Sequence, residues 1–237
     1  MERAIITDLI ESKISGEWGK EPSGDNAVFV IRTANFTNSG IISFENVVKR
    51  DIDVKKVEKK KLNHGDIIIE KSGGSPKQPV GRVVYFEKSS SEAYLCNNFT
   101  TILRPKKGKV NPKYLFYLLY NNYQTEKVLE FQNKTTGIIN LKLDRYIESE
   151  ISYEPNLETQ NKIVAILDKA QTILDKRVET IVKYDDLIRA TFLDMFGNIA
   201  NNPNGFDKKP LKDFGEIITG NTPPRKDKNN YDSNYIE

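Results

Sequence analysis

Residues 157–196 carry the feature that most constrains the fold, an apolar stripe of unusual length. Apolar side chains recur every three or four residues from Ile163 to Met195. This spacing predicts one continuous amphipathic helix. Pro155 precedes the stripe and Gly197 follows it, where a helix is expected to start and to end. About 40 residues at about 1.5 Å each would make a rod of about 60 Å.

A rod of this length cannot bury its whole stripe against one domain built from the preceding residues. The stripe needs a partner, which could be a second long helix, another copy of the chain or another protein. The rest of the sequence contains no helical pattern of comparable length. We therefore expect the partner to come from outside the chain. The alternative is a helix that lies partly on its own domain and is otherwise half exposed.

Residues 1–155 have the pattern of a compact mixed domain. Short apolar runs bounded by Gly, Asn or Asp indicate strands. The sequence at 72–76, Ser-Gly-Gly-Ser-Pro, predicts a turn. Asn111 and Pro112 predict the N-cap and first position of a helix. The expected strands lie at 27–31, 66–70, 80–86 and 99–103. The predicted fold class is therefore α+β, with a globular mixed α/β domain at 1–155 followed by one long helix of about 40 residues at 156–197.

A short sequence near the N-terminus recurs after the long helix. Asp8-Leu9 followed by Ser15-Gly16 has a counterpart in Asp213-Phe214 followed by Thr219-Gly220. The two copies start 205 positions apart, which favours an internal repeat. We therefore expect residues 198–237 to be a linker and the start of a second, truncated domain.

The net charge of +3 is unevenly distributed. The excess of basic residues lies within residues 1–155 and is greatest at 49–61, which holds seven basic and three acidic side chains. Such a patch is compatible with a polyanionic partner. A solvated surface loop or helix explains the same pattern equally well.

Cysteine content and hydropathy indicate the compartment. Cys96 is the only cysteine, so no intrachain disulfide framework can form. No run of about 20 apolar residues and no signal-peptide pattern is present. We expect a cytoplasmic protein without a membrane-bound part.

The sequences that are similar to catalytic motifs each lack a residue that the chemistry requires. Asn111-Pro112-Lys113-Tyr114 is similar to the Asn-Pro-Pro-Tyr of amino-methyltransferases but lacks the second Pro and a Gly-rich cofactor loop. Asp66 and Glu70 are spaced like nuclease carboxylates, yet Ser72 stands where the required Lys would be. His64 and Cys96 are too few for a zinc site or a nucleophilic triad. The sequence predicts no catalytic activity.

Several motifs occur together along the chain. A turn at 14–20 is followed by an apolar strand that ends in Arg32-x-x-Asn35. A Gly-Asp-Ile-Ile strand at 65–68 leads through a Ser-Gly-Gly loop to a Gly-Arg-Val strand. The most specific motif, Pro-x-Leu-Glu-x-Gln-x-x-Ile, covers 155–163 at the head of the long helix.

In these motifs, and over essentially the whole chain, the sequence resembles the specificity subunit of type I restriction–modification systems in a half-size form. The resemblance implies two target-recognition domains, each reading half of a split DNA site, with two antiparallel helices as the ruler between them. Residues 1–155 would be one target-recognition domain, 156–197 the spacer and dimerisation helix, and 198–237 a linker and the start of a truncated second target-recognition domain. The implied partners are double-stranded DNA and the methyltransferase and restriction subunits. Those subunits, and not this chain, would use S-adenosylmethionine, ATP and magnesium.

Two polar loops have side chains suited to DNA contact. Glycine lets backbone approach the duplex, lysine pairs with phosphate, and serine or glutamine can reach base edges. The loops are 71–78 and 132–137. The alternative for each is an ordinary surface turn without a role in binding. The predicted DNA-contacting residues are Arg32, Asn35, Lys71, Ser72, Gly73, Gly74, Ser75, Lys77, Gln78, Arg82, Lys134, Thr135, Thr136 and Lys142.

The resemblance and the apolar stripe together predict a homodimer through antiparallel helices. A twofold dimer of identical domains must read an interrupted palindrome. A different second chain would instead give an asymmetric target. Two other readings stay open: the recognition part of a fused restriction–methyltransferase polypeptide, and a decoy or regulator that occupies the methyltransferase subunit without reading DNA. The predicted dimer seam consists of Ile166, Ile173, Ile181, Ile188 and Phe192.

Overall fold

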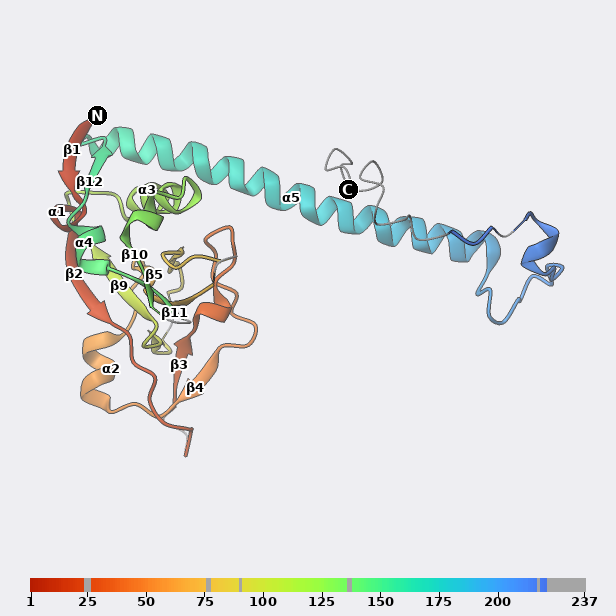
Figure 1. Cartoon of the computed structure of the whole chain (residues 1–237), viewed down its shortest axis with the longest axis horizontal. Helices are drawn as coiled ribbons and strands as arrows, with labels where there is room; N and C mark the ends of the chain where they lie inside the picture. The colour runs from red at the N-terminus through yellow and green to blue at the C-terminus, as the bar shows by residue number, and fades with distance from the viewer. Residues whose placement is uncertain (24–26, 76–77, 90, 136–137, 217, 221–237) are drawn as a thin grey trace, which may run out of the picture. The chain divides into compact units, whose positions relative to one another are not determined.

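The computed structural model describes residues 1–220 apart from 24–26, 76–77, 90, 136–137 and 217 (Figure 1). The chain divides into two compact units, Met1–Leu174 and Asp175–Glu237. The first unit has a mixed α/β architecture, as the sequence predicts.

A four-stranded antiparallel sheet forms the centre of the first unit. Its order is β2–β9–β5–β7. The pairing register places Ile67, Ile69 and Leu103 on one face and Ile68 and Ile102 on the other, because side chains alternate along a strand. All five side chains are buried, so both faces of the sheet are covered. The strands are β2 (Ile10–Ser15), β5 (Ile67–Glu70), β7 (Val83–Tyr85) and β9 (Thr100–Pro105).

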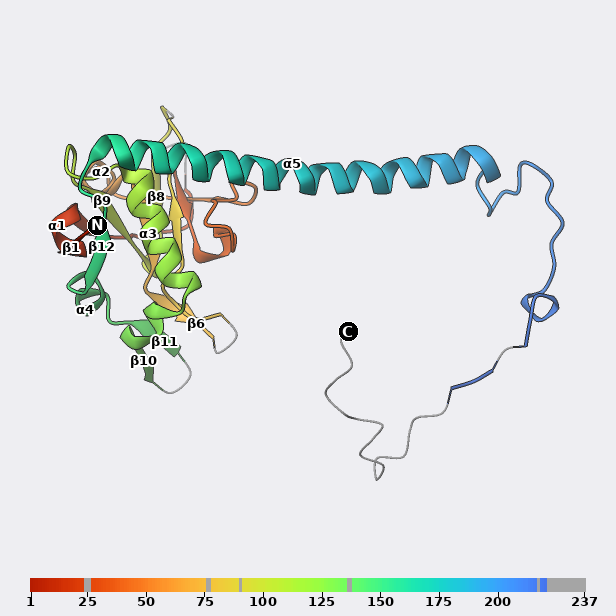
Figure 2. The same cartoon turned by 90° about the horizontal axis from the view of Figure 1, so that it is seen from above.

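Helix α3 (Pro112–Gln124) covers the first face of this sheet (Figure 2). The Asn111 side chain caps it by accepting hydrogen bonds from the backbone N–H of Lys113 at 2.8 Å and of Tyr114 at 3.1 Å. The predicted N-cap and first-turn proline are therefore confirmed. Two short helices, α1 (Ile6–Leu9) and α4 (Leu143–Ile147), complete the apolar cluster on this face.

A second apolar cluster covers the other face. It joins Ile68 and Ile102 to Ile31 and Tyr94 of a smaller sheet. That sheet has the order β4–β3–β8, with β3 and β8 parallel. Its strands are β3 (Val28–Ile31), β4 (Val48–Arg50) and β8 (Tyr94–Cys96), and the 3-10 helix Thr33–Asn35 and helix α2 (Val54–Lys60) lie in the connections.

A third sheet corrects the turn predicted at 72–76. Ser72–Gly74 is strand β6, which pairs with β11 (Ile138–Leu141) and, through it, with β10 (Gln132–Thr135). A Ser-Gly-Gly sequence has no strand preference of its own, so the pairing with a distant segment decides its conformation. Strands β1 (Glu2–Ile5) and β12 (Glu150–Tyr153) form a separate antiparallel pair, and a 3-10 helix spans Lys127–Phe131.

Helix α5 runs from Leu157 to Phe196 over 40 residues, with the bounds that the sequence predicts. The Asn156 Oδ1 accepts a hydrogen bond from the Thr159 N–H at 3.0 Å and caps the first turn. Gly197 has a φ of +69°, the left-handed backbone expected just after a helix. Near its start Val164 packs into the first apolar cluster. The predicted seam residues, in contrast, are 44% to 69% exposed.

The second unit contains the C-terminal part of α5 and the described residues that follow it. Phe196 contacts Phe206, and a 3-10 helix spans Leu211–Asp213. In the repeated sequence, Leu211 and Phe214 are 78% and 74% exposed, whereas Ile6 and Leu9 at the corresponding positions of the first copy are 0% exposed. The predicted repeat therefore has a buried first copy and an exposed second copy. Residues 217 and 221–237 lie outside the described residues.

Candidate nucleic-acid interface

The two polar loops predicted from the sequence meet in one sheet, β6–β11–β10 (Figure 2). The Leu141 N–H donates to the Lys71 carbonyl at 2.8 Å, which joins the base of one loop to the end of the other. The Ser72 hydroxyl donates to Asn140 Oδ1 at 2.5 Å. Segments that lie far apart in the sequence are thus joined in one sheet.

Ser75 and Gln78 pair with each other near the tip of the first loop. The Ser75 N–H donates to the Gln78 carbonyl at 2.8 Å, and the Gln78 N–H donates back to the Ser75 carbonyl at 3.1 Å. Both side chains are exposed. Gly73, just before the tip, has a φ of +99°, and a Cβ there would meet nothing within 4 Å. The glycine thus allows a left-handed backbone on an open surface.

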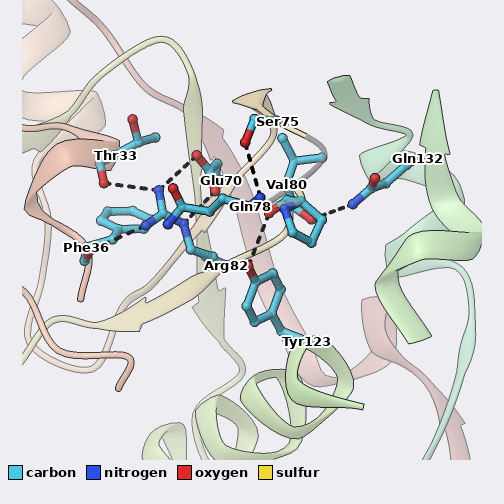
Figure 3. Close-up of polar contacts among 10 residues, drawn as sticks. Thr33, Phe36, Glu70, Ser75, Gln78, Val80, Arg82, Tyr123 and Gln132 are labelled. Carbon is cyan, nitrogen blue, oxygen red and sulfur yellow. Dashed lines mark hydrogen bonds and ion pairs between the residues drawn. The ribbon is translucent and has the colours of Figure 1, made fainter. Parts of the chain in front are cut away.

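Two side chains from neighbouring elements hold the far end of this loop (Figure 3). The Tyr123 hydroxyl of α3 donates to the Pro79 carbonyl at 3.3 Å. The Gln132 amide of β10 donates to the Val80 carbonyl at 3.0 Å. These bonds attach the residues that follow the loop to α3 and β10.

Arg82 is buried, with 8% exposure, and forms an ion pair with Glu70 (Figure 3). Its Nε donates to Glu70 Oε2 at 2.8 Å and its Nη2 to Glu70 Oε1 at 3.1 Å. The remaining bonds reach the carbonyls of Thr33 at 3.2 Å and Phe36 at 3.4 Å. This burial contradicts the base contact expected for Arg82, because its donors are already used inside the protein. The role that fits is positioning the loops.

Asn35 also has a structural role in place of the expected DNA contact. Its side chain is buried, accepts from the Arg32 N–H at 2.9 Å and donates to the Ser43 carbonyl at 3.1 Å. The Arg-x-x-Asn sequence therefore closes a local turn. Arg32 itself is half-buried and donates through Nη2 to the Asn46 carbonyl at 2.9 Å.

Of the remaining residues predicted to contact DNA, the structure describes some and not others. Lys71 is half-buried and Lys142 is exposed at the end of β11. Lys134 and Thr135 lie in β10, opposite Ile139 and Ile138, and their side chains fall outside the described part of the chain. Lys77 and Thr136 lie outside the described residues altogether.

The basic segment 49–61 is in part neutralised within the protein. Lys60 pairs with Glu17 at 2.8 Å and Lys56 with the same carboxylate at 3.2 Å. The hydrogen bond from Lys60 is the main reason that the pKa of Glu17 lies below its ordinary value. Arg50 stacks on the Trp18 ring at 4.2 Å and pairs with Glu21. Helix α2 has no buried residue, so this segment has the properties of a solvated face.

The model of the type I restriction modification DNA specificity domain matches residues 6–182. The chain belongs to this family.

Two solved structures share the fold of this specificity domain. One comes from work on complex assembly and conformational transition of the type I R-M system. Its TM-score is 0.57 at 14% identity, and the match covers 95% of this chain and 57% of that chain. The HsdS subunit from Thermoanaerobacter tengcongensis has a TM-score of 0.51 at 14% identity, over 88% of this chain and 51% of its own. The specificity domain thus spans about half the length of the chains it matches. No curated protein matches its sequence.

The family assigns the chain to the specificity part of a restriction–modification system and not to a catalytic part. Within the described residues, no three His, Cys, Asp or Glu side chains are grouped to hold a metal ion. The described helices also include none long and apolar enough to cross a membrane.

Sequence reasoning missed a cleft of the specificity domain that brings Lys71 and Lys142 together with Lys13 and Arg145. These four residues come from three parts of the chain, near positions 13, 71 and 142–145. No local pattern groups them, so only the tertiary structure could reveal the cluster.

Proposed function

We propose that this specificity domain reads one half of a bipartite DNA sequence for a type I restriction–modification complex. The observation that carries the proposal is that loop 71–78 and the described residues of loop 132–137 belong to one sheet. Lys71 and Lys142 lie at the base of this sheet, and the exposed Ser75 and Gln78 lie near its tip. DNA recognition requires both elements, because phosphate contacts set the register and base contacts specify the sequence.

The proposal gives different roles to the residues of this surface. Lys71 and Lys142 contact phosphates, which does not depend on sequence. Ser75 and Gln78 lie on the exposed turn and are the candidates for base edges. Gln78 is the stronger candidate, because its side-chain amide has no hydrogen bond within the described residues. The Ser75 hydroxyl, in contrast, accepts a hydrogen bond from the backbone N–H of Gln78 at 3.2 Å. Arg82 and Asn35 hold the frame behind this surface.

Helix α5 supplies the partner surface in this proposal. Its exposed stripe packs antiparallel against α5 of a second copy, so that two identical domains read an interrupted palindrome. A stripe with this much exposed apolar surface is otherwise unfavourable in water. The methyltransferase and restriction subunits dock on the assembled pair and contribute the S-adenosylmethionine, ATP and magnesium chemistry.

Light scattering on the purified chain tests the helix interface. The chain has a mass of 27.1 kDa, so a dimer has about twice that mass. Ile173→Asp with Ile181→Asp should convert the dimer to a monomer, because burying two carboxylates in an apolar seam is strongly unfavourable. Ala190→Asp, on the opposite side of the helix, is the matched control and should leave the dimer intact. A dimer that survives the double substitution would exclude the helix as its seam.

Site selection with the assembled methyltransferase complex tests DNA reading. A palindromic site and an affinity that falls steeply with salt are expected. An asymmetric site would show that the second half comes from a different chain. A complex that binds methyltransferase but has no DNA preference would contradict the proposal and favour a decoy or regulator.

A further inference from the structure

A basic cleft of about 510 Å³ lies where strands β2 and β9 meet the junction between β11 and α4. Its lining includes four cationic side chains, those of Lys13, Lys71, Lys142 and Arg145, and one carboxylate, Asp144. Asp144 pairs with Lys13. Among the described residues, the charged ends of the other three cations have no hydrogen-bond or ion-pair partner. The cleft therefore has a surplus of uncompensated positive charge.

The register of the central sheet explains why this cleft is polar. Ser15 pairs with Thr101, and Thr101 pairs with Ile69, so the three side chains share one face. This is the face that carries Ile67 and Leu103 in the first apolar cluster. The face changes from apolar to polar at Thr101, and the cleft begins at that boundary. A sheet face that only needed covering would stay apolar there.

Thr101 supplies a second and independent observation. Thr101 is only 1% exposed, and its hydroxyl has no hydrogen-bond partner among the residues that the structure describes. A buried hydroxyl without a partner is unfavourable and calls for an explanation, such as a ligand that completes the bond. Thr101 is one of the residues that line the cleft.

Cationic groups and a hydroxyl donor together select an oxyanion. The position of the cleft indicates which oxyanion it binds, namely a phosphate of the DNA backbone. Lys71 directly precedes β6 and Lys142 directly follows β11, so the cleft lies at the base of the sheet whose tip is proposed to read bases. A duplex that contacts the tip would bring its own phosphates toward this base.

We infer that the cleft holds a phosphodiester group of the bound DNA, with Lys71, Lys142 and Arg145 as the charged partners and Thr101 as a hydroxyl donor. This inference rests on the DNA-reading function proposed above. The bound phosphate sets the register of the domain on the duplex and carries no sequence information.

Salt dependence of DNA binding tests the cleft directly. Affinity of the full chain, alone and in the methyltransferase complex, is measured for a selected site and for unrelated duplex over about 50 to 200 mM salt. Lys142→Gln and Arg145→Gln should each make the negative slope of log affinity against log salt shallower by about 1. Each should also lower the affinity for both kinds of DNA by about three- to tenfold at 0.1 M salt. Lys59→Gln, an exposed lysine of α2, is the matched control and should change neither quantity.

Thr101→Val separates binding from folding. Valine has the shape of threonine without the hydroxyl, so the variant should keep or raise the melting temperature of the free chain while lowering DNA affinity. An unchanged affinity in Thr101→Val would remove the hydroxyl from the inferred site.

The outcomes separate this inference from the proposed function. Wild-type site preference with unchanged slopes in both cleft variants would overturn the cleft alone. Lost methyltransferase binding with unchanged DNA affinity would also overturn it, and would make the cleft a site for an acidic protein surface. Absence of DNA binding by the wild-type complex would overturn the proposed function itself.

Discussion

Arg82 and Glu70 form a two-point ion pair inside the first unit, with Nε–Oε2 at 2.8 Å and Nη2–Oε1 at 3.1 Å. The pair connects strand β5 to the carbonyls of Thr33 and Phe36 (Figure 3). Both carboxylate oxygens and most guanidinium donors are satisfied, which a buried charge pair requires. The pair therefore joins the turn at 33–36 to the strand that leads into the polar loop.

Removing one member of this pair should be strongly destabilising. Arg82→Ala is expected to lower the free energy of unfolding by about 3–5 kcal/mol, because it leaves the buried Glu70 carboxyl group without its partner. The double variant Glu70→Ala with Arg82→Ala should lose much less stability than the summed losses of Glu70→Ala and Arg82→Ala. Urea unfolding followed by circular dichroism measures all of these. Strict additivity would show that the two residues are not coupled.

Gln160 should determine how the start of α5 is attached. Its side chain is 0% exposed, donates to the Glu154 carbonyl at 2.6 Å and accepts from the Asn111 N–H at 2.6 Å. Gln160→Ala leaves two part-buried backbone groups without these partners and should cost about 1–3 kcal/mol in free energy of unfolding. Lys169→Ala, an exposed position of the same helix, should change the value by less than about 0.5 kcal/mol. Equal effects of the two variants, measured by urea unfolding, would contradict this role.

Gly16 and Gly220 occupy corresponding positions of the repeated sequence, and they should respond differently to alanine. A Cβ at Gly16 would lie 1.9 Å from the Asn97 carbonyl oxygen, whereas a Cβ at Gly220 would meet nothing within 4 Å. Gly16→Ala should lower the melting temperature by several degrees, since overpacking costs about 1–3 kcal/mol. Gly220→Ala should leave it unchanged. Comparable losses in the two variants would mean that the second copy is packed like the first.

Cys96 should be protected from alkylation at neutral pH. Burial raises the pKa of its thiol from 9.0 to about 11. The folded state therefore keeps a proton that the unfolded state releases as the pH rises past 9. This contribution to stability is fully present below pH 9 and is lost as the pH rises through about 11.

Two measurements check the cysteine prediction. Iodoacetamide at pH 8 should modify the thiol only as fast as the chain unfolds, and adding urea should accelerate the reaction. Thermal stability between pH 9 and 11 should fall less steeply in Cys96→Ala than in the wild type, because the variant lacks this ionisation. Rapid labelling of the folded chain would show that the thiol is accessible.

Elements that depend on local signals could be predicted well. Helix α5 has the predicted bounds because its start, its stripe and its terminal glycine all lie in one continuous segment. The Asn111 cap of α3 was predictable for the same reason, since cap and helix are adjacent. The expected strands were placed within a few residues, because apolar runs between turn residues mark strands.

The candidate site was predictable only in part. Loop 71–78 was recognised from its composition, but its first residues are a strand because β11 pairs with them. Arg82 has the composition of a DNA contact, yet its carboxylate partner lies 12 positions away on a neighbouring strand and holds it inside. Thr101 and Arg145 gave no signal, since neither belongs to a polar loop or a motif.

The sequence by itself determined the family, the long helix with its apolar stripe, and the residue types available for DNA contact. Such properties depend on contiguous segments, because spacing, capping and turn chemistry act over a few residues. Only the tertiary structure decided which polar groups are used inside the protein and which face outward. Arg82 and Asn35 turn inward, while Lys142 and Arg145 stay exposed beside the basic cleft. The physical reason is that burial and ion pairing depend on contacts between distant segments, which no local pattern encodes.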